Sequence, residues 1–450
     1  MNNQSSHTSQ LFPMPLTSME RFHWFDRNSR FNNHIFGRLV FKGSVDLQLA
    51  DQATKHAYSR HPLLLCRIVE INGKQVWDWD SSLSESFRWN GDRNDDDSTG
   101  TPCLKISCHQ EGEFTHVLFE VSHAIGDGLA AIMGIVDVLQ TYHGLVSNGD
   151  ANVKLRKLDD EALLQRDSLG LTRYSYLKHL WKQPLGLYGA AKFINRKPLE
   201  LFPSSKTIAP LDPDSKPTIQ GVWLDMEASQ RLKEKAAELE VATNTLFFGE
   251  LMKTLESFRD RYVESNSPWI RVLLPMSVRT FADRRLSACN RATIVQVDRK
   301  ASDFASANFY QSLDREIKII REWELSKLFL LSIRGMAKVP GMLQKAATTD
   351  KCRGTAVFAN LAEPLRQLRV PTKPSELNSE VEQLHVGNLQ LVDLDFVGPI
   401  RHRMPMNFSV QKHLGRFRIS LHLDLRVVPV ETGQEILSAY QQAMLNLVSI

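Results

Sequence analysis

Apolar and polar positions along the chain follow two different periods. Period-two alternation and short apolar runs predict strands in the first third of the chain, over residues 35–42, 63–70, 75–79, 104–109 and 113–122. Apolar residues at helical spacing predict helices over 44–60, after a Ser44 cap, and over 129–142. Because strands and helices alternate, the pattern predicts an α/β (α+β) protein.

The second half of the chain repeats this outline without a detectable sequence repeat. Strands are expected over residues 218–225 and 269–274, helices over 227–240, 244–263 and 431–448, and a long hairpin over 404–424. The stretch 201–216 is rich in Pro, Ser and Asp, which is typical of a linker. We therefore predict a disordered N-terminus (1–17), an N-terminal lobe (18–204), a linker (205–217) and a C-terminal lobe (218–450).

Composition indicates a globular protein in a reducing compartment. The chain has 450 residues, of which 42% are hydrophobic and 24% charged, and a formal net charge of +4 that is too mild to indicate nucleic-acid binding. Five scattered Cys without a CxxC pair predict neither disulfides nor a zinc site, and none of the fourteen His has zincin spacing, so no metal is predicted. The polar N-terminus and the absence of a long apolar run favour the cytoplasm.

The candidate chemistry lies in VLFEVSHAIGDGLAA, Val117 to Ala131. An apolar run stops at Ser122 and His123, and Asp127-Gly128 follows four residues later. A strand end holds an imidazole rigidly at a cleft, and glycines let the chain turn there. A lone His at a strand end is, however, often a hydrogen-bonded core residue.

The residues around His123 resemble the HxxxD acyltransferases. His123-x-x-x-Asp127-Gly128 stands between a predicted strand and an amphipathic helix, about a quarter of the way along the chain. The superfamily includes chloramphenicol acetyltransferase, peptide-synthetase condensation domains, plant BAHD acyltransferases and wax ester synthases. The resemblance implies two chloramphenicol acetyltransferase-like lobes, each a mixed β-sheet flanked by helices, with an active-site tunnel between them.

Other stretches extend the resemblance. LLPMSVRTFADRRLSACN, residues 273–290, is similar to a strand end with Pro-x-x-x-Arg and a later Asn, and implies that Arg279 pairs with the motif Asp127. Residues 354–360, GTAVFAN, resemble a strand ending in Asn. Two positions depart from the common pattern: Ser122 stands where many members have a second His, and Lys412-His413 stands where many have Ser-Tyr. These departures leave the subgroup and substrate open.

Acyl transfer fits these residues. A base must take the proton of the attacking alcohol or amine, and an imidazole suits this role at neutral pH. We predict that His123 is this base, that the donor is acyl-CoA or an acyl-carrier protein, and that no cofactor is needed. Candidate donors to the tetrahedral oxyanion are the Gly128 N–H, Asn360 and Ser409.

Some alternatives remain. Asp127 either orients His123 or, paired with Arg279, pins the loop from within the core; we favour the second. The chain is alternatively a non-catalytic condensation-like domain that binds a carrier protein or a lipid ligand. Residues 170–200 are basic and aromatic, and they form either a crossover helix between the lobes or a peripheral membrane contact.

Overall fold

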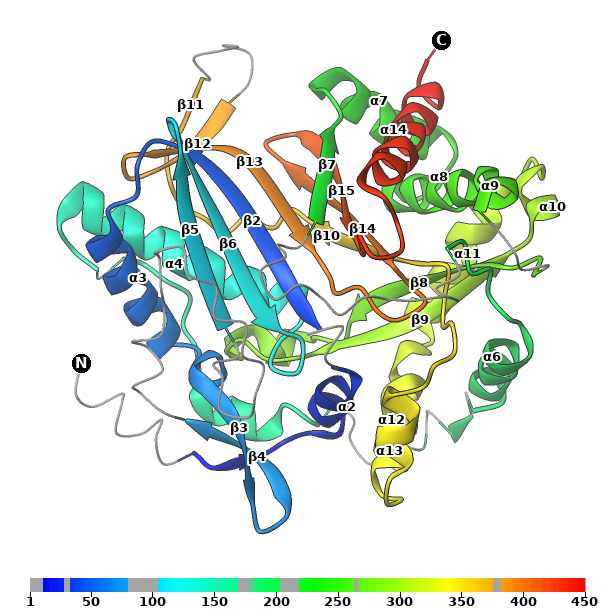
Figure 1. Ribbon diagram of the computed structural model, residues 1–450, viewed down its shortest axis with the longest axis horizontal. Helices are drawn as coiled ribbons and strands as arrows, with labels where there is room; N and C mark the ends of the chain where they lie inside the picture. The colour runs from blue at the N-terminus through cyan, green and yellow to red at the C-terminus, as the bar shows by residue number, and fades with distance from the viewer. Residues whose placement is uncertain are drawn as a thin grey trace.

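Two six-stranded sheets lie side by side at the centre of the protein, with helices on their outer faces (Figure 1). A computed structural model describes residues 11–27, 33–79, 104–151, 153–168, 177, 180–181, 183–202, 218–262, 267–374 and 382–449. Each sheet has its own apolar core. The predicted linker (205–217) and most of the 169–182 stretch lie outside the described residues.

The first sheet is antiparallel throughout and has the strand order β11-β12-β13-β2-β6-β5. Its first-half strands β2, β5 and β6 agree with the predicted ones, and helices α3 and α4 cover one face (Figure 1). Asp46 caps α3 instead of the predicted Ser44, because its carboxylate accepts the N–H groups of two residues in the first turn. These elements span β2 (His34–Lys42), α3 (Leu47–Ser59), β5 (Leu104–Glu111), β6 (Phe114–Ser122) and α4 (Gly128–Asn148).

Helix α4 is long and apolar enough, by length and composition alone, to cross a membrane. In this structure 78% of its apolar window is buried inside the protein. It packs into the core of the first lobe, so its apolar character is explained by burial.

A small third sheet, β1-β4-β3, adjoins the first lobe. The predicted strand over 63–70 begins as a 3₁₀ turn, Pro62–Leu65, before β3 (Cys66–Ile71) pairs with β4 (Lys74–Trp79) across a turn at Asn72-Gly73. β1 (Met14–Pro15) pairs with β4. The predicted disordered N-terminus (1–17) therefore includes residues that are ordered. Residues 11–17 are held by this strand pairing and by the Thr17 cap of α2 (Ser18–Asp26).

The second sheet is mixed, with the order β7-β15-β14-β10-β8-β9, and β10 is parallel to both β8 and β14. Helices α7, α8 and α14 lie over one of its faces (Figure 1). Helix α8 begins after Ala242 without a side-chain cap. The strands and these helices span β7 (Thr218–Trp223), α7 (Met226–Glu238), α8 (Thr243–Ser257), β8 (Ile270–Ser277), β9 (Ala292–Arg299), β10 (Ala356–Ala362), β14 (Met406–His413), β15 (Arg416–Leu423) and α14 (Val430–Asn446).

Three strands from the second half of the sequence belong to the first sheet, which corrects the predicted division at 205–217. They are β11 (Thr372–Pro374), β12 (Glu382–Val386) and β13 (Leu389–Val397). β13 pairs with β2 along its length and carries the fully buried Asp395. Arg38 of the first sheet and Arg418 of the second both bind this carboxylate, so Asp395 joins the two sheets.

Shorter helices close the lower side of the molecule in the view of Figure 1, where α2, α12 and α13 lie near the ends of β8 and β9. Helix α12 packs against β9 and α2. The remaining elements are the 3₁₀ turns Asp160–Gln165 and Phe281–Arg285 and the helices α6 (Gln183–Asn195), α9 (Arg259–Tyr262), α10 (Ala301–Phe304), α11 (Phe309–Glu322), α12 (Ser326–Ala337) and α13 (Met342–Ala347).

Candidate active site

His123 follows the last residue of β6, and hydrogen bonds fix both its backbone and its ring. Its N–H donates to the Asn33 carbonyl at 2.9 Å, and the Asn290 side-chain amide donates to the His123 carbonyl at 2.7 Å. Its Nδ1 lies 2.9 Å from the Gly126 carbonyl. Because a carbonyl only accepts, this contact assigns the proton to Nδ1 and leaves the lone pair on Nε2.

Asp127 points away from the His123 ring. One carboxylate oxygen caps α4 by accepting the Ala130 N–H at 2.9 Å. The other accepts from Arg279 at 2.5 Å and from the Arg291 N–H at 2.8 Å. Asp127 is 3% exposed, and Arg279 also donates to the Cys289 carbonyl at 2.7 Å. The motif Asp therefore ties the His123 loop to the strand end of the second lobe, while Gly128 begins α4.

The environment of His123 favours the neutral imidazole. Burial lowers the pKa of His123 from its ordinary value of 6.5 to about 4, and the positive charge of Arg401 adds to this effect. The Gly126 carbonyl and the charge of Asp127 act in the opposite direction but do not outweigh burial. At neutral pH, His123 therefore holds an unprotonated Nε2 that can accept a proton.

A second imidazole, which the sequence analysis missed, stacks on the first. The rings of His23 and His123 have centroids 3.9 Å apart and an interplanar angle of 28°. His23 comes from α2, and its Nδ1 lies 3.4 Å from the Asn33 amide. Burial, followed by the charges of His123, Arg401 and Arg353, holds the pKa of His23 well below its ordinary value. A neutral ring therefore covers one face of His123.

His23 and His123 line a cavity of about 1940 Å³. Gly128 also lines it, together with residues of both sheets and of the α6 and α12 helices. The cavity wall is largely apolar, and its apolar side chains include Phe22, Ile35, Leu273, Phe329, Val357 and Phe396. The volume exceeds the roughly 300–1,000 Å³ of ordinary ligand pockets, so the cavity has room for two substrates at once.

Two arginines in the cavity wall share one carboxylate. Arg401 lies 2.7 Å and Arg353 lies 3.7 Å from Asp26 at the end of α2. Arg353 also donates to the carbonyls of two residues at the end of α13. Burial, together with the charge of Arg401, lowers the pKa of Arg353 to about 10. The charge of Arg401 lowers the pKa of both His123 and His23, and the charge of Arg353 adds to this effect on the pKa of His23.

Two predicted oxyanion donors do not reach this site. Asn360 is exposed, and its amide donates to the Asn244 side chain at 2.7 Å, while its strand neighbours Ala359 and Leu361 line the cavity. Side chains alternate along a strand, so Asn360 faces the other way. Ser409 is fully buried and its hydroxyl donates to the Phe396 carbonyl at 2.5 Å. Neither side chain lines the cavity, and Gly128 is the predicted donor that does.

The described part of the 170–200 segment forms α6 at the cavity edge. Leu187, Tyr188 and Ile194 are more than half exposed, and all three also line the cavity. Lys192 lies over the Tyr188 ring at 4.3 Å. This helix therefore brings exposed apolar side chains and the basic Lys192 to the wall of the cavity.

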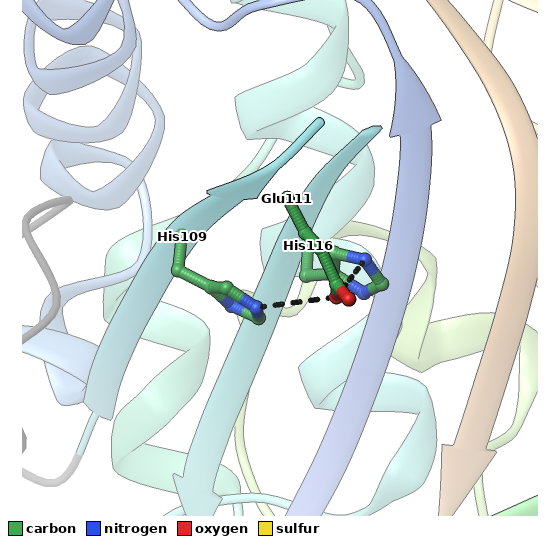
Figure 2. A group of neighbouring side chains, drawn as sticks. All are labelled: His109, Glu111 and His116. Carbon is green, nitrogen blue, oxygen red and sulfur yellow. Dashed lines mark ion pairs between the residues drawn. The ribbon is translucent and has the colours of Figure 1, made fainter. Parts of the chain in front are cut away.

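A separate cluster lies outside the cavity, at the tip of the β5–β6 hairpin. His109, Glu111 and His116 have ligand-type atoms that all lie within 4.8 Å of one another (Figure 2). The four cysteines among the described residues are free thiols, so the structure shows no disulfide within that part of the chain.

Comparisons with solved structures identify the same fold in several known proteins. Polyketide synthase associated protein 5 from Mycobacterium tuberculosis matches with a TM-score of 0.61 and 14% identity, over 97% of this chain and 98% of that one. The first condensation domain of the CDA synthetase matches with a TM-score of 0.66 and 11% identity, over 97% of each chain. The starter condensation domain of rhizomide synthetase, solved with C8-CoA and Leu-SNAC, matches with a TM-score of 0.63 and 11% identity, over 100% and 96%.

No protein-family model matches the chain, and its sequence matches no curated protein. At 11–14% identity, the structural matches establish the fold alone. The two-lobed condensation-domain fold implied by the HxxxD resemblance is therefore confirmed.

Proposed function

We propose that this chain, which has the condensation-domain fold, is an acyltransferase with His123 as its general base. The acyl group comes from a thioester, either acyl-CoA or an acyl-carrier protein, and goes to a hydroxyl or amine acceptor. One observation carries the proposal: the His123 ring is held by the Gly126 carbonyl, with a neutral Nε2, in a cavity large enough for donor and acceptor.

The reaction needs no covalent enzyme intermediate. Nε2 of His123 takes the acceptor's proton as the acceptor oxygen or nitrogen bonds to the thioester carbonyl carbon. The carbonyl π electrons move to oxygen and give a tetrahedral oxyanion. When the intermediate collapses, the carbon–sulfur bond breaks, and the thiolate receives the proton from His123. We assign the oxyanion to the N–H groups at the start of α4, where Gly128 lines the cavity.

A neutral base suits the direct attack of an alcohol or amine. Its conjugate acid is destabilised by burial, so it passes the proton on readily when the thiolate leaves. Asp127 acts on this chemistry only through the loop, because its carboxylate is occupied by Arg279 and two backbone N–H groups. We therefore propose that Asp127 and Arg279 position His123.

A panel assay tests the proposal. Purified protein is incubated with acyl-CoA thioesters of increasing chain length, or with an acylated carrier protein, together with pooled alcohols and amines. Acylated products are then identified by mass spectrometry. We expect acceptor-dependent product from the wild type and none above background from His123→Ala. Equal product from the two proteins, with either donor, would overturn the proposal.

A second candidate function follows from the exposed apolar surface of α6. In this alternative the chain is a non-catalytic, condensation-like domain that binds a lipid or a carrier protein, with residues 170–200 as the contact. Flotation with anionic liposomes separates the two functions. Binding that is lost in a Leu187→Glu, Ile194→Glu variant, with no product in the panel assay, would favour this alternative.

A further inference from the structure

The cluster at the tip of the β5–β6 hairpin has the residue types of a transition-metal site. Residues 109–111 end β5, Gly112 makes the turn with a φ of +59°, and β6 begins at Phe114. The antiparallel register places His109 directly opposite His116. Cross-strand partners project from the same face of a sheet, so the two imidazoles lie next to each other.

The ring geometry supports this placement. The two imidazoles stack with centroids 4.8 Å apart and an interplanar angle of 19°. Glu111 is two residues from His109 on the same strand, and strand side chains repeat with period two, so its carboxylate reaches the same face. One carboxylate oxygen lies 3.9 Å from Nε2 of His109 and 3.5 Å from Nε2 of His116 (Figure 2).

These distances approach those of a bound zinc ion. Zn²⁺ binds His nitrogen and carboxylate oxygen at about 2.0–2.2 Å, which places tetrahedral ligand atoms roughly 3.3 Å apart. Metal binding would require side-chain rotations that bring the three atoms to this spacing. The side chains of His109, Glu111 and His116 are 48%, 76% and 28% exposed, so water can reach the cluster and supply the fourth ligand.

We propose that His109, Glu111 and His116 bind one divalent transition-metal ion, with Zn²⁺ as the best fit to two nitrogens and one carboxylate. The ligand set fits zinc better than calcium or magnesium, which prefer oxygen ligands alone. The three positions sit on a hairpin whose strands are paired from end to end, so the backbone holds the ligands in place before the metal arrives.

The site is independent of the proposed acyl transfer. His116 lies near the beginning of β6 and His123 just beyond its end, and seven residues of extended chain span roughly 23 Å. No residue of the cluster lines the large cavity. β5 is the edge strand of its sheet, so the ion would hold the end of this edge strand to β6.

The thiols of the protein are poor competitors for the ion. Cys66, Cys108 and Cys289 are buried, and burial raises the pKa of the Cys108 thiol to about 11 and that of Cys289 to about 12. Burial and the charge of Glu200 raise the pKa of Cys352 to about 12 as well. Zinc binds thiolates, so these four described thiols are unfavourable ligands at neutral pH.

Calorimetric titration with Zn²⁺ at pH 7.5 tests the site, on the 450-residue chain without a polyhistidine tag. We expect one ion per chain for the wild type, binding at least tenfold weaker for Glu111→Gln, and loss of this site in the double variant His109→Ala, His116→Ala. His56→Ala, which removes an imidazole from α3, should bind like the wild type. Because the ligands bind in their unprotonated form, affinity should fall at pH 5.5.

Co²⁺ supplies an independent readout, since its visible absorption reports tetrahedral coordination. Zn²⁺ should displace this absorption in the wild type, and the double variant should lack it while keeping its circular dichroism spectrum and melting temperature in the absence of metal. Absence of one-to-one binding by the wild type would overturn the proposal. So would equal affinity in the wild type and in a folded double variant.

Discussion

Two pairs of stacked imidazoles lie near opposite ends of β6, and they differ mainly in their surroundings. His23 and His123 stack at 3.9 Å inside the cavity, whereas His109 and His116 stack at 4.8 Å on the hairpin surface. Burial and nearby guanidinium groups hold the first pair neutral. The second pair is open to solvent and shares a carboxylate neighbour, Glu111. Under our two proposals, imidazoles therefore act as a desolvated base in the first pair and as metal ligands in the second.

Removing one imidazole from each pair tests most strongly whether the two pairs differ in their effect on turnover. His123→Ala should lower turnover about 10²- to 10⁴-fold, the range supplied by a positioned general base. His116→Ala should leave turnover unchanged, because this residue lies outside the cavity. Steady-state rates of thiol release measure both variants. A similar loss in the two variants would show that the rate depends on overall stability and not on the buried base.

The loop that carries His123 depends on the buried pair of Asp127 and Arg279. Asp127→Asn leaves the Arg279 charge uncompensated and should lower the free energy of unfolding by about 3–5 kcal/mol. Urea denaturation measures this loss. The double variant Asp127→Asn, Arg279→Met should recover part of it, because no unpaired charge remains. Unchanged unfolding with a large loss of turnover would instead assign Asp127 a direct role in catalysis.

Loss of the His23 ring that stacks on His123 should lower the rate less than loss of His123 or of Asp127. An aromatic pair contributes about 0.5–1.5 kcal/mol. His23→Ala should therefore lower kcat up to about tenfold, with little change in KM, whereas His23→Phe should retain most of kcat because it keeps a ring against His123. Comparable losses in the two variants, expressed mainly in KM, would indicate that His23 binds substrate through its nitrogens.

Buried neutral histidines also predict how stability depends on pH. Burial lowers the pKa of His123, His413 and His422 to about 4 each, and that of His23 falls as well. Between pH 6.5 and 4 the unfolded chain binds more protons than the folded one, so the free energy of unfolding must fall as pH falls through this window.

Denaturation at pH 7.0, 5.5 and 4.5 measures this slope. His422→Phe removes one of these groups, which packs edge-on against Phe36, and should make the slope shallower. Unfolding free energies that are independent of pH between 7.0 and 4.5 would contradict the neutral state of these histidines.

The sequence predicted the elements that local periodicity controls. The β6 strand, the α4 helix and the turn at His123 follow from adjacent residues, as do β14 and β15 of the long hairpin. The HxxxD resemblance added the two-lobed fold. The resemblance also predicted the contact between Asp127 and Arg279. Local patterns could not predict it, because 152 positions separate the two residues.

The contacts that sequence reasoning missed come from distant segments. His23 lies one hundred positions before His123, and nothing in its neighbourhood indicates that the two rings stack. β11, β12 and β13 belong to the first sheet because β13 pairs with β2, which is far away in the sequence. The cross-strand pair of His109 and His116 depends on the register of β5 with β6, which the predicted strand bounds 104–109 and 113–122 did not give.

The pH dependence of kcat/KM tests the central claim most directly, because it reports the pKa of the essential base in the free enzyme. If neutral His123 is that base, the acid limb should lie well below 6.5, towards the value of about 4 that burial imposes, and should disappear with the activity in His123→Ala. An acid limb at or above 6.5, or the same profile and rate in His123→Ala, would contradict the account.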